Sequence, residues 1–308
     1  MILHTGMRTD IPGFYSEWFA NRLREGFVLV RNPYNPLSVT RYLLDPRVVD
    51  MIGFCTKNPA PMLRYMDLLR PFVQYWFVTI TPYGTDIEPN VPAVPAVLES
   101  FRALSSWTGA GRIVWRYDPI LLTPQWTAER HLSAFRRMAR ALYGATHSVV
   151  ISFIKLYEKV KVNYPEVRAV PLSEQILLTQ ELVRIAREFD MTIKVCGDSR
   201  GLEATGADCR GCMTLQTYEE AIGQRLLVPS LPRNRSECAC YLSGDIGAYN
   251  TCRHFCRYCY ANTDRSTVLR NMRLHDPASP FLIGNTQPGD VIHQAKQQSW
   301  IDPQLRFF

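Results

Sequence analysis

The sequence predicts an α/β protein, with a partial or modified (βα)6 TIM-like barrel followed by a cysteine-rich segment. Short apolar segments alternate with longer segments of helical period through the first two thirds of the 308 residues. This alternation is typical of βα units around a parallel sheet. From about Gly201 onward it stops, and Cys, Gly, Pro and Asn become frequent. We therefore expect a barrel over residues 1–200 and a second segment, residues 201–308, folded against it.

Six short apolar segments have the composition of buried parallel strands, which are hydrophobic on both faces. They are Met1–Thr5, Val49–Cys55, Tyr75–Thr81, Arg112–Arg116, Ser148–Phe153 and Thr192–Cys196. An additional hairpin around the NPYNP sequence is predicted after the first helix, with strands at Phe27–Arg31 and Ser38–Leu44. The first six strands would form the sheet and the hairpin would be an insertion.

Two helices between the strands are marked by apolar residues that recur on one face. The recurring residues are Leu132, Phe135, Met138 and Leu142 in the first helix, and Leu178, Leu182, Ile185 and Phe189 in the second. Gly144 is the predicted stop of the first helix, and Ser173, which follows Pro171, is the predicted cap of the second. Both apolar faces suit packing against a sheet.

The composition, with 46% hydrophobic and 20% charged residues and no low-complexity tract, is that of a globular protein. The opening residues MILHTGMRTD carry no basic leader, and no stretch reaches the roughly 18 apolar residues that a membrane span needs. We expect a cytoplasmic protein with no membrane partner. The net charge of +7 comes from 35 basic residues scattered among 28 acidic ones, which disfavours a nucleic-acid partner but leaves it open.

The strongest motif is Cys252-Arg-His-Phe-Cys256-Arg-Tyr-Cys259, a C-x3-C-x2-C array. Three thiolates at this spacing can bind three irons of a [4Fe–4S] cubane and leave the fourth iron open. We call Cys252, Cys256 and Cys259 the cysteine triad, and we expect it to make residues 201–308 an iron–sulfur, metal-binding segment. The alternative is a structural zinc site that His254 or another cysteine completes, since zinc takes four Cys or His ligands.

Several segments, taken together, resemble an uncharacterised prokaryotic family whose C-terminal cysteine cluster is similar to that of radical S-adenosylmethionine enzymes. They are Arg8-Thr-Asp-Ile-Pro12, Thr56-Lys-Asn-Pro59, Thr81-Pro-Tyr-Gly84, Trp115-Arg-Tyr-Asp-Pro119, Asp245-Ile-Gly-Ala-Tyr249 and Cys259-Tyr-Ala-Asn262. The likeness covers nearly the whole chain. It implies S-adenosylmethionine bound at the open iron and cleaved reductively to a 5′-deoxyadenosyl radical. Enzymes of that kind usually carry the cysteines after the first strand, whereas this triad follows the sixth predicted strand.

Polar residues just after predicted strands are the candidates for binding the cofactor or substrate, because ligands bind at this end of βα barrels. They are Arg8, Asp10, Lys57, Asn58, Tyr83, Arg116 and Asp118. Such groups can orient a carboxylate, a ribose or a phosphate. The alternative is structural ion pairing, of Arg8 with Asp118 or of Arg116 with Asp10. No catalytic residue is assigned.

The remaining cysteines suggest a second metal site, either another iron–sulfur cluster or a zinc ion. The candidate ligands are Cys196, Cys212, Cys238 and Cys240. The alternative is a set of free thiols in a cluster-rich pocket. Cys55 is expected to be a small buried hydrophobe.

The sequence thus predicts a radical S-adenosylmethionine enzyme that modifies a small-molecule or unknown substrate and takes electrons from a donor such as ferredoxin or flavodoxin. The alternative is a metal protein whose C-terminal zinc or iron–sulfur site is structural or transfers electrons.

Overall fold

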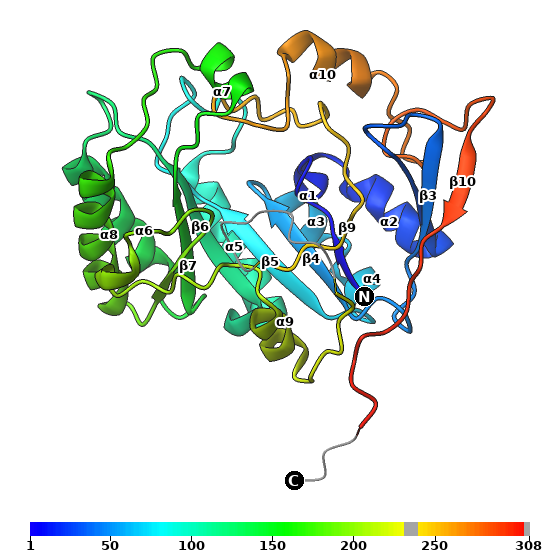
Figure 1. Cartoon of the computed structure of the whole chain (residues 1–308), viewed down its shortest axis with the longest axis horizontal. Helices are drawn as coiled ribbons and strands as arrows, with labels where there is room; N and C mark the ends of the chain where they lie inside the picture. Colours follow the sequence, from blue (N-terminus) through cyan, green and yellow to red (C-terminus); the bar gives the residue numbers. More distant parts are fainter. Residues whose placement is uncertain (231–239, 305–308) are drawn as a thin grey trace.

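A computed structural model describes residues 1–230 and 240–304 of the chain. Its centre is a parallel seven-stranded sheet flanked by helices, with the strand order β8-β7-β6-β5-β4-β1-β9 (Figure 1). The strands are β1 (Ile2–His4), β4 (Met51–Thr56), β5 (Gln74–Thr79), β6 (Ile113–Ile120), β7 (Ser148–Phe153), β8 (Thr192–Val195) and β9 (Gly244–Asp245). The predicted α/β class with a parallel sheet is therefore confirmed.

Each of the six predicted sheet strands is present, and a seventh, β9, joins them. Strand β9 pairs parallel to β1, with Leu3 opposite Gly244 and His4 opposite Asp245. It therefore brings the cysteine-rich part of the chain into the sheet. Among the described residues, strand pairing leaves β8 and β9 at opposite ends of the sheet, and no pairing that closes a barrel is seen.

Helices connect successive strands and cover the sheet (Figure 1). They are α1 (Ile11–Phe14), α2 (Ser16–Glu25), α3 (Ala60–Leu63), α4 (Met66–Leu69), α5 (Val94–Thr108), α6 (Ala128–Leu142), α7 (Glu158–Asn163), α8 (Leu172–Arg187), α9 (Leu215–Ile222) and α10 (Arg265–Met272). Short 3-10 turns lie at Ala110–Arg112 and Glu203–Thr205. In α6 the residues Phe135, Met138 and Leu142 are buried, as the pattern predicts.

The predicted stop of α6 agrees with the structure, whereas the predicted cap of α8 does not. Helix α6 ends at Leu142, and Gly144 follows with a positive φ of 74°, a conformation that glycine adopts without strain. The predicted cap Ser173 is wrong, because α8 begins at Leu172 with Pro171 in the capping position and no side-chain hydrogen bond there. The Pro171 carbonyl accepts a hydrogen bond from the Gln175 amide at 3.0 Å. Ser173 therefore lies inside the first turn of the helix and not at its capping position.

A smaller sheet has the order β10-β3-β2 and contains the predicted hairpin. Strands β2 (Phe27–Arg31) and β3 (Ser38–Leu43) are antiparallel, and β10 (Val291–Gln294) pairs parallel to β3. The segment that follows α10 therefore returns to lie beside the N-terminal hairpin (Figure 1).

Aromatic side chains from neighbouring elements form the centre of the core. The rings of Phe54 and Trp76 stack at 3.9 Å between centroids, and Trp115 stacks on Phe135 at 4.7 Å. His131 is also buried, and its ring contacts the Tyr117 hydroxyl at 2.7 Å and the Leu121 carbonyl at 2.9 Å. Burial lowers the pKa of His131 to about 4, so we interpret this histidine as a satisfied core residue.

Within the described ranges, none of the helices combines the length and the apolar character that crossing a membrane requires.

Candidate functional site

A cavity of about 920 Å³ lies where the strands of the large sheet end. Parallel strands all deliver their following loops to one edge, so residues far apart in sequence converge there. Five of the seven predicted strand-end residues line this cavity. They are Arg8, Asp10, Lys57, Arg116 and Asp118. The lining does not include the other two, Asn58 and Tyr83.

Tyr83 is held in a different way. Its hydroxyl donates to the Pro119 carbonyl at 2.7 Å and accepts from the Leu121 amide at 3.1 Å. It is 7% exposed and belongs to a buried apolar cluster beside the cavity. The sequence places it at a strand end, but these contacts give it a structural role.

The two predicted ion pairs are wrong, because different partners are nearer. Arg116 pairs with Asp118 at 2.5 Å, and Arg8 lies 3.8 Å from Asp245. Residues two apart on a strand face the same side, which explains the first pair. The second depends on β9, which the sequence does not predict. Burial raises the pKa of Asp245 to about 6, although Arg8 opposes this.

The cysteine triad lies in the loop between β9 and α10, and all three of its cysteines line the same cavity as the strand-end residues. Each is a free thiol. Burial raises the pKa of each thiol, and neighbouring negative groups add to the rise at Cys252 and Cys256. Metal coordination is what makes such thiols thiolates, since a bound metal ion deprotonates its sulfur ligands.

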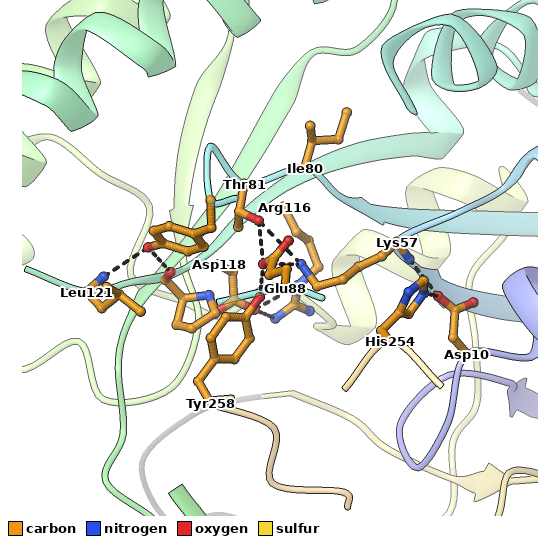
Figure 2. A network of polar contacts seen from close by, with 12 residues as sticks. Asp10, Lys57, Ile80, Thr81, Glu88, Arg116, Asp118, Leu121, His254 and Tyr258 are labelled. Atoms are coloured by element: carbon orange, nitrogen blue, oxygen red, sulfur yellow. Dashed lines mark hydrogen bonds and ion pairs between the residues drawn. The ribbon is translucent and has the colours of Figure 1, made fainter. Parts of the chain in front are cut away.

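The loop that carries the triad is fixed to α1 by His254. Its Nε2 donates to Asp10 Oδ2 at 2.8 Å (Figure 2). Its Nδ1 lies 3.2 Å from the Asn90 carbonyl. The Asp10 carboxylate also accepts from the Lys57 amide at 2.8 Å and from the Thr56 hydroxyl at 2.6 Å. A single buried carboxylate thus joins the ends of β1 and β4 to the triad loop.

Tyr258 fixes the other half of the loop (Figure 2). Its hydroxyl donates to Glu88, whose carboxylate also accepts from Thr81 at 2.6 Å and from Lys57 Nζ at 3.0 Å. Burial disfavours the charged form of Lys57, but Glu88 and Cys256 outweigh that effect and raise its pKa. Lys57 therefore places a positive charge beside the triad.

The sequence predicts some of the residues that anchor the loop, since Asp10 and Lys57 are strand-end candidates. It gives no signal for Glu88, which lies in an irregular segment with no periodicity. The contacts of His254 and Tyr258 are not predictable either, because their partners are far away along the chain.

The described side chains do not form a site for a single zinc ion. Across residues 1–230 and 240–304, no three His, Cys, Asp or Glu side chains are arranged so that they could hold one metal ion. Both ring nitrogens of His254 are already engaged, which removes it as the fourth zinc ligand. A cubane needs no common centre, because each thiolate binds a different iron.

A second group of thiols also lines the cavity. Cys196 follows β8, Cys212 precedes α9, and Cys240 precedes β9; we call these three the second thiol group. The fourth predicted ligand, Cys238, lies outside the described residues. A hydrogen bond from Cys212, opposed by burial and aided by Arg116, lowers the pKa of Cys196 to about 7.

The other two cysteines differ from this group. Cys209 forms a C-x2-C pair with Cys212 in sequence, but it is not among the residues that line the cavity. Cys55 lines the cavity, and burial raises its pKa to about 12, so its thiol is neutral.

A family model with the description "Domain of unknown function (DUF1848)" matches residues 2–261. The match includes the whole large sheet, the triad and the second thiol group. A search of curated proteins finds no match.

Proposed function

The chain belongs to this family of unknown function, and from its site we propose that it is a radical S-adenosylmethionine enzyme. In this proposal the cysteine triad holds a [4Fe–4S] cluster, and the strand-end polar residues orient cofactor and substrate in the cavity. One observation carries the proposal: the three thiols and five predicted strand-end residues line a single cavity. A cluster there would supply an electron to S-adenosylmethionine and give a 5′-deoxyadenosyl radical.

The position of the triad in the fold supports the proposal. The resemblance to radical S-adenosylmethionine enzymes implies cysteines after the first strand, which is an end strand when parallel strands are laid down in order. Here the triad follows β9, and β9 is an end strand of the sheet beside β1. The order along the chain differs, but the triad again follows an end strand. We retain a partial (βα)6 barrel, rather than a closed one, as the architecture for this function.

The cavity suits a small anionic ligand. Lys57 and Arg116 both line it, and each is paired with a buried or partly buried carboxylate. Such pairs keep the cations charged and fixed in direction, so that they can bind a carboxylate or phosphate without reorganisation. Apolar residues, Phe153 and Ile154 among them, also line the cavity.

The remaining parts of the proposal concern partners. The substrate is a small molecule or an unidentified larger one, and the electron comes from a donor such as ferredoxin or flavodoxin. The reaction would take place in the cytoplasm.

The test is anaerobic purification and reconstitution, with iron and sulfide counted, followed by dithionite and S-adenosylmethionine and chromatography for 5′-deoxyadenosine. The proposal expects 5′-deoxyadenosine from the wild-type chain and none from Cys256→Ala. A matched control is Cys209→Ala, because Cys209 does not line the cavity. This control should retain cleavage.

Two results would favour a different metal protein. Zinc in place of iron would indicate a structural site. A reduced, intact cluster that never cleaves S-adenosylmethionine, with or without candidate substrates, would indicate electron transfer. In the structural case Cys256→Ala should also lose its fold, since structural metals contribute folding energy directly.

A further inference from the structure

Helix α10 follows the triad loop (Figure 1), and together these two segments expose many arginines. From Asn250 to His275 the sequence has five arginines, no lysine and a single acidic residue, Asp264. Arg257 is paired with Glu166 at 2.6 Å. The other four arginines are exposed, and we call them the arginine face: Arg253, Arg265, Arg270 and Arg273.

The positive charges of the arginine face are not neutralised by carboxylates. Within residues 1–230 and 240–304, none of the four arginines forms an ion pair. Asp264 is engaged as the cap of α10, where it accepts from the Ser266 hydroxyl at 2.6 Å and from the Thr267 amide at 2.8 Å. Exposed, unpaired arginines on one face give a positive potential that extends into the solvent.

Part of the arginine face lies against the triad loop itself. Phe255 stands between Cys252 and Cys256 in the sequence, and the Arg265 guanidinium lies 4.9 Å from the centre of its ring. The φ of Phe255 is 55°, a left-handed conformation that few residues other than glycine adopt. Leu269, one turn after Arg265 on α10, is 42% exposed. The arginine face therefore includes exposed apolar surface, and it reaches to within one residue of a triad cysteine.

A small acidic protein fits this surface by charge. Interfaces between electron-transfer partners are small and transient, and opposite charges on the two partners speed their encounter. We propose that the arginine face docks a small acidic protein that carries single electrons. The reduced carrier would give up one electron to a cluster held by the triad, with no bond formed or broken. The inference rests on the proposed function, because a carrier has an acceptor at this place only if the triad holds a cluster.

Nucleic acid is the other anionic partner that arginines bind. Proteins that hold single strands stack successive bases on exposed aromatic rings. The two rings next to the arginine face already have a guanidinium over them, with Arg253 at 5.0 Å from the centre of the Phe14 ring and Arg265 over Phe255. These contacts, and the position beside the triad, favour an acidic protein.

The experiment measures the binding of two acidic one-electron carriers, a flavodoxin and a ferredoxin, to the full chain reconstituted anaerobically with iron and sulfide. Isothermal titration calorimetry gives the Kd at low salt and at about 0.5 M salt, where surface charges are strongly screened. We expect at least one carrier to bind the wild-type chain. A variant with Arg253→Glu and Arg265→Glu should bind that carrier about tenfold more weakly or worse at low salt, and the difference should shrink at high salt.

A matched control separates docking from net charge. It carries Arg137→Glu and Arg140→Glu, at two exposed positions of α6, and it changes the net charge by the same amount. This control should bind the carrier as the wild-type chain does. The milder pair Arg253→Gln and Arg265→Gln should give an intermediate loss. Iron content, circular dichroism and reduction of the cluster by dithionite should match the wild type in all three variants, which excludes unfolding as the cause.

Four results would overturn the proposal. Neither carrier binds the wild-type chain, the Arg253 and Arg265 variants bind as the wild type does, the α6 control loses as much affinity, or single-stranded DNA binds more tightly than either carrier and depends on the same arginines. Failure of the proposed function is a different result: a wild-type chain whose cluster is reduced by the carrier and which still releases no 5′-deoxyadenosine.

Discussion

Replacing Asp10 with asparagine tests whether the protein itself positions the triad loop. The side chain is 5% exposed and its oxygens accept from Gly13, Thr56, Lys57 and His254 at distances between 2.6 and 2.8 Å. An amide of the same shape keeps one oxygen and turns an NH2 group toward two of these donors. The change therefore removes acceptors without removing volume.

The expected cost follows from the donors that lose their acceptor. A buried donor left without a partner costs roughly 1–3 kcal/mol. Two such donors predict a loss of about 2–6 kcal/mol in the free energy of unfolding, which makes this a severe single substitution. Because one of the donors is His254 Nε2, the loop between Cys252 and Cys256 also loses an anchor. We expect the triad to bind iron about 10-fold more weakly or worse, as when groups that orient metal ligands are removed.

Asp50→Asn is the matched control. Asp50 is also 5% exposed, and its carboxylate accepts from the Met1 ammonium and Ser299 Oγ at 2.6 Å and from the Trp300 amide at 2.8 Å. It directly precedes β4, at the end of the sheet opposite the cavity. Asp50→Asn should therefore lose comparable stability and retain its iron.

Urea unfolding, followed by circular dichroism, measures the stability of both variants. Iron per chain is counted after anaerobic reconstitution without urea, at a temperature where both variants are folded. Equal iron in the Asp10 and Asp50 variants would refute the reasoning, since the His254 contact would then be irrelevant to the loop. Unchanged stability in Asp10→Asn would refute it too, because the two lost hydrogen bonds would then contribute nothing to stability.

Three further predictions concern the sheet and its strand ends. The stability of Asp245→Asn relative to wild type should rise as the pH increases from about 4 to 6. The folded pKa of Asp245, about 6, exceeds the unfolded value of about 4, so ionisation of this buried carboxyl costs the wild-type protein stability as the pH rises through this range. Urea unfolding at pH 4 and pH 7 measures the difference, and a difference independent of pH would contradict the prediction. Gly6→Ala should be strongly destabilising because its Cβ would lie 2.3 Å from the Cys55 carbonyl oxygen. Gly111→Ala is the control, because a Cβ there meets nothing within 4 Å, and equal thermal unfolding midpoints for the two variants would contradict the predicted clash. Phe54→Ala should cost about 3–5 kcal/mol by leaving a cavity in the aromatic core, and a loss below about 1 kcal/mol in urea unfolding would show that the core collapses into the space.

The sheet strands were predictable where their signal is local. Ser148–Phe153 is an apolar, β-branched segment between polar ones, and it matches β7 residue for residue. Strand β9 has no such signal, because its two residues, Gly244 and Asp245, are defined only by pairing with β1. Since β9 sets the position of the triad relative to β1, the sequence could not supply the arrangement of the site.

The candidate site shows the same division between local and distant information. Cysteine spacing and strand-end position are local, and they identified the triad and most of the polar cavity lining. Partner choice is not local: Asp10 and His254 lie 244 residues apart, and Arg8 pairs with Asp245 rather than with a strand-end residue of the first half. A pattern of residue types names the groups that can pair, whereas the fold decides which of them meet.

The contacts of the triad loop bear on what a metal would do there. A structural metal is required where the chain has no other means of holding its ligands together. Here the loop is held by His254 on Asp10, by Tyr258 on Glu88, and by Asn262 Nδ2 on the Cys252 carbonyl at 2.8 Å, all of them contacts between protein groups. A loop that is already positioned has no need of a metal for its shape. The proposed cluster would therefore serve chemistry at the edge of the cavity rather than the shape of the loop.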